Sequence, residues 1–135
     1  MYRIHHVPPG VEEYRALRAA VGWASPSPEA CRRALDAGPF GVVARREDTA
    51  GVGEAVGMAR LVGDVTMYLL LVDVAVRPEH QGAGLGRRMV ADLTGWVAAH
   101  GTRTTMLLAD PTVVPFYKKL GFSMTDVCAM KYRPA

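Results

Sequence analysis

Residues 66–88 constrain the fold of this chain more than any other stretch. Residues 66–76 are rich in leucine and β-branched side chains and hardly alternate with polar ones, which predicts a strand buried on both faces in the centre of a sheet. A proline and a glycine-rich turn, residues 81–86, follow directly. Residues 86–99 then carry one apolar face with helical spacing, formed by Met89, Val90, Leu93, Trp96 and Val97. A buried strand that feeds a tight turn and an amphipathic helix is typical of α/β domains.

Local patterns predict the other elements. We expect further strands over residues 1–6, 40–46, 54–62, 104–109, 122–124 and 127–132, and helices over residues 11–21, 28–37 and 112–120. Ser27 is the expected N-cap of the second helix, and a turn is expected at residues 47–53. The predicted fold class is therefore α/β (α+β), with a mixed, mostly antiparallel sheet and helices on both faces.

Composition narrows the classes of partner. The chain has 135 residues, so we expect one domain over residues 1–135. Its net charge of +3 suits an anionic ligand such as a nucleotide-bearing cofactor. The basic residues come in scattered pairs without interleaved aromatic residues, so no nucleic-acid partner is expected.

Cysteines, histidines and apolar runs indicate the compartment. Cys31 and Cys128 lie far apart without metal-ligand spacing, which favours two free thiols in a reducing compartment. The four histidines are scattered, so we expect no metal site. Residues 1–10 contain no apolar core of signal-peptide length, and the apolar run at residues 67–72 is too short to cross a bilayer. The expected localisation is cytoplasmic, with no membrane partner.

The turn at residues 81–86 has the features of an anion-binding loop. Gly82, Gly84 and Gly86 remove Cβ atoms from the loop, so its N–H groups can converge on one anion, and the following helix N-terminus adds unpaired donors. A Rossmann fingerprint would need glycine where Arg87 stands, and no Gly-Lys-Ser/Thr of a P-loop occurs. A glycine turn without a ligand is the remaining alternative. His80, just before this turn, is expected to face solvent.

Two motifs resemble those of one protein family. Val76–Gly86 reads V-R-P-E-H-Q-G-A-G-L-G, and Pro115–Phe122 reads P-F-Y-K-K-L-G-F. Both resemble, in the right order, the two signatures of the GCN5-related N-acetyltransferases, and the resemblance extends over nearly the whole chain. It implies the acyl-CoA N-acyltransferase fold, in which the central strand (about 66–76) splays from the next strand (about 104–109). It also implies acetyl-CoA as co-substrate, without a metal.

The resemblance also implies roles for individual residues. Backbone groups of Val74, Ala75 and Val76 would bind the pantetheine arm, and Phe116 would pack nearby. The pyrophosphate would be bound by the turn and the helix start: Gln81, Gly82, Ala83, Gly84, Leu85, Gly86 and Arg87. Tyr117 would protonate the leaving thiolate, which is reasonable because phenol and thiol pKa values are close.

The acceptor side is less determined by the sequence. Asp73 is a candidate for orienting or deprotonating the amine, and a structural carboxylate satisfied by arginine or backbone is the alternative. Tyr68 and Asp110 are further pocket candidates, although relatives often have asparagine where Asp110 stands. Trp23 and Tyr14 are candidates for shaping acceptor choice or, equally, for core packing.

The predicted function follows from the donor side. We expect an acetyl-CoA-dependent N-acetyltransferase that acetylates a primary amine of a small molecule by direct attack in a ternary complex. The alternatives are a protein or peptide N-acetyltransferase and a non-catalytic acyl-CoA-binding regulatory module. A homodimer formed through the last strands is the assembly considered.

Overall fold

The computed structural model describes residues 1–48 and 53–135, and its strands form one five-stranded sheet in chain order. The predicted turn at 47–53 lies mostly outside the described residues. The strands are β1 (Tyr2–His5), β2 (Phe40–Arg46), β3 (Ala55–Gly63), β4 (Tyr68–Val76) and β5 (Thr104–Leu107). The helices are α1 (Val11–Ala20), α2 (Pro28–Ala37), α3 (Leu85–His100) and α4 (Val114–Lys118), with short 3-10 helices η1 (Pro78–His80) and η2 (Pro111–Val113). The expected fold class is confirmed.

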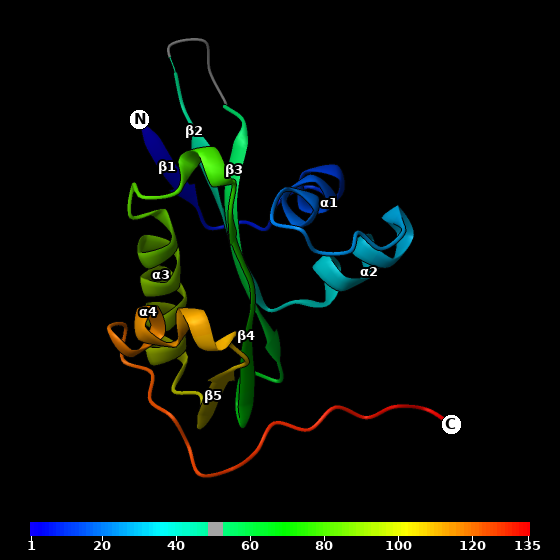
Figure 1. Cartoon of the computed structure of the whole chain (residues 1–135), viewed down its shortest axis with the longest axis vertical. Coiled ribbons are helices and arrows are strands. Elements are labelled where there is room, and N and C mark those ends of the chain that lie inside the picture. The colour runs from blue at the N-terminus through cyan, green and yellow to red at the C-terminus, as the bar shows by residue number, and fades with distance from the viewer. Residues whose placement is uncertain (49–52) are drawn as a thin grey trace.

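Helices cover both faces of the sheet (Figure 1). On one face, α3 buries Leu85, Met89, Val90 and Leu93 against β2, β3 and β4. On the other face, α1 and α2 bury Tyr14, Leu17, Cys31 and Leu35. The apolar face predicted for residues 86–99 is therefore the one that packs on the sheet. Ser27 caps α2 as expected, since its hydroxyl accepts a hydrogen bond from the Ala30 N–H at 3.2 Å.

The sheet is antiparallel from β1 to β4, and only β4 and β5 pair in parallel. Their pairing runs from Tyr68 opposite Thr104 to Leu71 opposite Leu107 and ends there, whereas β4 continues to Val76 and stays paired with β3. The predicted splay between these two strands is thus present. It frees one backbone edge of β4 over residues 72–76.

Two predictions about strands are wrong. The strand expected in the sheet centre, β4, lies next to the edge, because only the four-residue β5 lies beyond it. The strands expected at 122–124 and 127–132 are not formed, and the chain after Phe122 runs away from the sheet (Figure 1). A strand needs a neighbouring ladder, and within the described residues none lies beside this segment. Its apolar side chains are exposed: Met124, Val127, Met130 and Tyr132.

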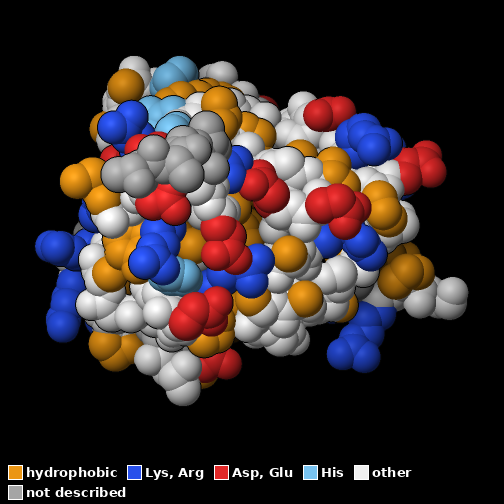
Figure 2. Space-filling view, turned by 90° about the horizontal axis from the view of Figure 1, so that it is seen from above, with side chains coloured by type: hydrophobic (Ala, Val, Ile, Leu, Met, Phe, Trp, Pro, Cys, Tyr) orange, Lys and Arg blue, Asp and Glu red, His pale blue; other side chains and the backbone are white. Residues whose placement is uncertain are grey.

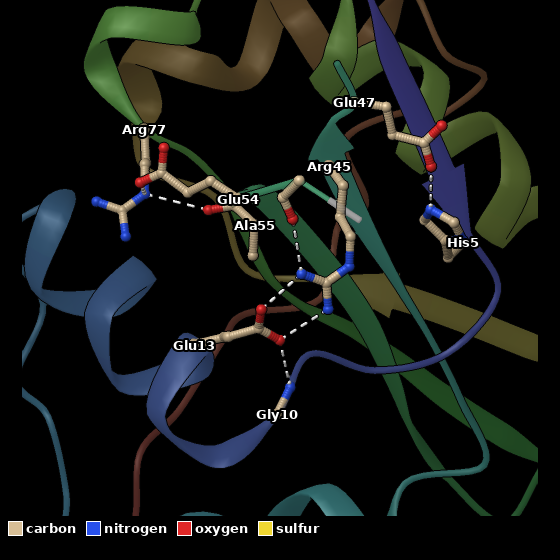
Figure 3. Close-up of polar contacts among 9 residues, drawn as sticks. His5, Gly10, Glu13, Arg45, Glu47, Glu54, Ala55 and Arg77 are labelled. Carbon is tan, nitrogen blue, oxygen red and sulfur yellow. Dashed lines mark hydrogen bonds and ion pairs between the residues drawn. The ribbon is translucent and has the colours of Figure 1, made fainter. Parts of the chain in front are cut away.

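The N-terminal end of α1 is fixed to the sheet by a bidentate ion pair (Figure 3). Both terminal nitrogens of Arg45 on β2 donate to the Glu13 carboxylate, at 2.6 and 2.9 Å. Glu13 also accepts a hydrogen bond from the Gly10 N–H at 3.0 Å, which satisfies a donor just ahead of the helix. These contacts hold the pKa of Glu13 below its usual value, with the Arg45 hydrogen bond as the main cause.

The surface shows no dominant charge of one sign from above. Figure 2 shows acidic and basic side chains interspersed on that face. Within the described residues, no helix is both long and apolar enough to cross a membrane. Cys31 is buried and Cys128 exposed, and both are free thiols, as expected.

Candidate functional site: a cavity at the splay of the sheet

The glycine-rich turn has the backbone that an anion-binding loop requires. Gly82 and Gly84 have φ angles of 87° and 80°, a region that L side chains rarely adopt, and Gly84 caps the start of α3. The first N–H groups of α3 have no acceptor within the helix. The Gln81 side chain donates to the Val76 carbonyl at 3.0 Å and so ties the turn to the end of β4.

His80 does not face solvent, contrary to expectation. Its side chain is buried, and its Nδ1 lies 2.8 Å from the Tyr2 hydroxyl. The cause is the η1 turn, which folds His80 back beneath the loop toward β1. No local pattern in the sequence signals a contact across 78 positions.

The second motif packs directly on the first. A Cβ built on Gly86 would lie 3.3 Å from the Cζ of Phe116, so glycine at this position lets the aromatic ring approach the helix start. Tyr117 follows on α4 and makes an edge contact with Phe116 at 5.0 Å between ring centroids. Burial raises the pKa of Tyr117, and no described residue is a hydrogen-bond partner of its hydroxyl. The phenol therefore stays protonated and available to a ligand.

These elements surround a cavity of about 710 Å³. Its volume lies within the range typical of small-molecule and cofactor sites. The lining includes every residue predicted for catalysis or coenzyme binding except Ala75 and Ala83: Asp73, Val74, Val76, Gln81, Gly82, Gly84, Leu85, Gly86, Arg87, Phe116 and Tyr117. Ala75 is buried against the α1 and α2 side of the sheet, so its side chain faces away.

Other lining residues come from the far side of the splay. Leu108, Ala109 and Val113 line the cavity although no motif marked them, whereas the further lining residue His80 lies within the first motif. Each follows a strand end or a turn beside a motif, which is the only available signal. Trp23 lines the cavity as one of its two suggested roles requires, whereas Tyr14 is buried in the core.

The two further pocket candidates differ. Asp110 lines the cavity, but its carboxylate accepts hydrogen bonds from the N–H and hydroxyl of Thr112, at 2.9 and 2.8 Å. Those bonds, the backbone one first, lower the pKa of Asp110. Tyr68 is exposed and does not line this cavity.

Asp73 borders the cavity, and its carboxylate accepts three hydrogen bonds. It accepts hydrogen bonds from the Tyr14 hydroxyl at 2.6 Å, from Arg18 at 2.9 Å and from Arg60 at 2.7 Å. Burial raises the pKa of Tyr14, and its hydrogen bond to Asp73 adds to this, so the hydroxyl remains a donor. One carboxylate between two guanidinium groups leaves this cluster with one net positive charge. These contacts are of the kind expected for the structural alternative considered for Asp73.

The residues present fit a coenzyme A thioester. The turn offers converging N–H groups to a pyrophosphate, and the free edge of β4 offers backbone groups to amides of an extended arm. Within residues 1–48 and 53–135, no three His, Cys, Asp or Glu side chains are grouped as metal ligands.

Comparisons with known proteins agree with this geometry. Residues 9–122 match the family model described as the acetyltransferase (GNAT) family. Over 112 residues the chain is 41% identical to a chloroplastic serotonin N-acetyltransferase 2 of Oryza sativa, covering 78% of this chain and 52% of the relative. It is 30% identical over 123 residues to an uncharacterized ycf52-like N-acetyltransferase of Prochlorococcus marinus, covering 89% and 68%.

A solved structure extends the agreement to the fold. A probable acetyltransferase of Staphylococcus aureus superposes with a TM-score of 0.84 at 25% identity, over 99% of this chain and all of that one. The match of the family model shows that the chain belongs to the GNAT family of acetyltransferases. The chain spans only about half the length of the rice relative.

Proposed function

We propose that residues 1–135 form one N-acetyltransferase domain that transfers the acetyl group of acetyl-CoA to a primary amine of a small molecule. The observation that carries the proposal is the single cavity that joins the glycine turn, the free edge of β4 and the Tyr117 hydroxyl. Family membership supports the same chemistry.

Different residues of the chain bind different parts of acetyl-CoA. N–H groups of residues 82–87 bind the pyrophosphate, and backbone groups of Val74 to Val76 bind the pantetheine arm. Phe116 lies against Gly86 and limits how that arm is placed. Acetyl-CoA supplies the activated thioester carbonyl.

The reaction is a direct displacement at that carbonyl. The neutral amine nitrogen forms the new C–N bond, the C–S bond breaks, and the Tyr117 phenol donates its proton to the departing sulfur. The attacking nitrogen loses its proton to water in the cavity, because Asp73 already accepts three hydrogen bonds between two guanidinium groups. Water then returns a proton to the Tyr117 phenolate, so the enzyme regains its starting state. Positioning and proton supply are thus the main contributions of the protein.

Two observations favour a small acceptor over a basic peptide. The acceptor side of the cavity is bounded by Trp23 and by Asp73, whose charge is outweighed by Arg18 and Arg60. A lysine-rich peptide would bring several positive charges to this positive cluster, whereas a small primary amine brings one at most. The rice relative carries the name of a small-amine acetyltransferase.

Turnover with a panel of amines and peptides tests the proposal. We expect acetyl-CoA-dependent release of CoA with at least one small primary amine, and a kcat roughly 10²-fold lower for Tyr117→Phe with unchanged CoA affinity. Tyr132→Phe, at an exposed tail position, is the matched control. Equal rates for Tyr117→Phe and parent would remove the role of Tyr117. Turnover confined to peptides would establish the peptide enzyme, and tight CoA binding without any turnover would establish the binding module.

Compartment and assembly complete the proposal. We infer a cytoplasmic protein from the two free thiols, although the rice relative is named as chloroplastic.

We infer a homodimer because each chain has both an unpaired apolar tail and an uncovered part of its sheet. On the side of α1 and α2, Tyr68 and Met106 are 60% and 44% exposed beside the free edge of β5.

A further inference from the structure

Asp73 occupies an unusual backbone position in β4. Its φ angle is 56°, which non-glycine residues adopt only when the surroundings compensate for it. The register between β3 and β4 shifts there: Arg60 pairs with Val72, and Met58 pairs with Ala75. Two residues of β4, Asp73 and Val74, therefore stand opposite one residue of β3, which defines a β-bulge.

The bulge changes which side chains of β4 face α3. Before it, the odd-numbered Leu69 and Leu71 pack with α3; after it, the even-numbered Val74 and Val76 do so. The same segment parts from β5 after Leu71. The extra residue thus sets both the facing of residues 74–76 and the free edge that borders the cavity.

Three side chains from two other elements hold this residue. Tyr14 and Arg18 lie one helical turn apart on α1, and Arg60 comes from β3. Their donors reach the two oxygens of the Asp73 carboxylate at 2.6, 2.9 and 2.7 Å. Asp73 and Arg60 keep only 11% and 13% of their side chains exposed, so their ion pair is little screened by water.

The donors are themselves fixed. The Arg18 Nε donates to the Ala24 carbonyl at 2.7 Å, and its guanidinium lies over the rings of Tyr14 and Trp23, at 5.8 and 5.4 Å. The opposite end of α1 is tied to β2 by Glu13 and Arg45 (Figure 3). Helix α1 is therefore a rigid support against which the bulge is held.

We propose that Tyr14, Arg18 and Arg60 are positioning residues for the coenzyme, which act through Asp73 to hold the bulge that keeps the free edge of β4 preformed. This inference rests on the proposed function and adds to it an anchor on the side of the sheet opposite the glycine turn. Asp73 acts through its backbone position, and the three donors determine the affinity for coenzyme A rather than proton transfer.

Substitutions that keep the backbone conformation separate this role from catalysis. Asparagine and glycine both tolerate a positive φ, so Asp73→Asn and Asp73→Gly remove the anchor without forcing the strand straight. Arg60→Met removes one donor and leaves an apolar stem of similar length. Arg33→Met, at an exposed pair on α2, is the matched control.

Calorimetric titration with CoA, in the absence of any acceptor, is the first measurement. We expect roughly tenfold weaker CoA binding for Asp73→Gly and Arg60→Met, and parental binding for Arg33→Met. The double variant Asp73→Asn/Arg60→Met should lose less affinity than the sum of its single variants, because it leaves only Arg18 without a charged partner, whereas Asp73→Asn alone leaves both Arg18 and Arg60 so. Thermal unfolding of each variant identifies any that does not fold. In that case the CoA affinity of Asp73→Asn is compared with that of the parent.

Steady-state kinetics provide the second measurement. We expect KM for acetyl-CoA to rise while kcat and the shape of its pH profile stay close to the parent. Unchanged CoA affinity with a large fall in kcat and loss of a pH limb in Asp73→Asn would make Asp73 a proton acceptor and overturn the inference. If the parent binds CoA but acetylates no amine, the proposed enzymatic function fails, while the CoA affinities of the variants still test the positioning role of Tyr14, Arg18 and Arg60. If the parent binds no CoA, the proposed function and the positioning role both fail.

Discussion

At the residue scale, the contact between Gly86 and Phe116 joins the two motifs of the site. Because a Cβ at position 86 would meet the Phe116 ring at 3.3 Å, Gly86→Ala should displace that ring toward the cavity. We expect KM for acetyl-CoA to rise severalfold with little change in thermal stability. Steady-state kinetics with varied acetyl-CoA measure the effect.

Gly95 provides a control on the same helix. A Cβ at this position meets nothing within 4 Å, so Gly95→Ala should stabilise α3 by roughly 0.5–1 kcal/mol and leave KM unchanged. A rise in KM of equal size in both variants would show that replacing any glycine of α3 by alanine disturbs the site.

A second prediction at this scale concerns the pH dependence of Tyr117. The phenol must be protonated to act as a donor, and burial raises its pKa above the usual value of about 10. The donor form therefore persists as pH rises, and kcat should decline only above about pH 10. Tyr117→Phe should lack this decline over the pH range in which circular dichroism shows a folded protein. A Tyr117-dependent decline centred near pH 8 contradicts the assignment.

The sequence predicted most residues that line the cavity, but not the side chains that contact Asp73 from behind it. The turn at residues 81–86 is marked by its own glycines, so local chemistry was sufficient. The partners of Asp73 come from positions 14, 18 and 60, and no local pattern connects those positions to β4. The i, i+4 spacing of Tyr14 and Arg18 indicates a shared helix face but not what that face touches.

At the scale of elements, the attachment of α1 to β2 should depend on pH. Arg45 depresses the pKa of Glu13, so the ion pair contributes stability above the unfolded pKa of about 4.5 and loses it as pH falls through the lower folded value. The difference in Tm between parent and Glu13→Gln should therefore shrink as pH falls below about 4.

Glu29→Gln is the control for this prediction. Glu29 pairs with Arg33 in an exposed contact on α2, so its substitution should change Tm little at any pH. A Glu13→Gln effect that stays constant down to pH 3 would assign the loss to packing and not to the ion pair.

Most elements could be predicted because their signals are local. Apolar spacing, Ser27 and the glycine turns determine α1, α2, α3 and the strands to within a few residues. The segment at residues 127–132 has strand-like residues but pairs with no strand of the described chain, and pairing depends on tertiary contacts that the local sequence does not report. The prediction that β4 lies in the sheet centre was wrong for a related reason, because an apolar composition indicates burial but not the order of strands in the sheet.

At the scale of the whole molecule, the exposed tail leads to a prediction about assembly. If the tail of one chain pairs with the free edge of β5 in a second copy, each chain buries the apolar residues that its partner exposes. We expect a dimer by light scattering after gel filtration, and a monomer for the double variant Val127→Lys/Met130→Lys.

Val7→Lys is the control for this prediction. Val7 is 54% exposed but lies outside both the tail and β5, so its substitution should leave the dimer intact. A monomeric parent, or a dimer that persists in the double variant, contradicts this assembly.

The order of strands along the sheet has a consequence for how the chain acquires its structure. Strands β2, β3 and β4 follow one another without an intervening helix, whereas β5 joins β4 only after the chain has passed through α3. The closing contact is a four-residue parallel ladder, and parallel pairing requires a long crossover to close first. The two walls of the cavity therefore meet late in folding and separate early in unfolding. Amide hydrogens of β5 should exchange with solvent by partial opening, while those of β2 and β3 report the unfolding of the whole domain.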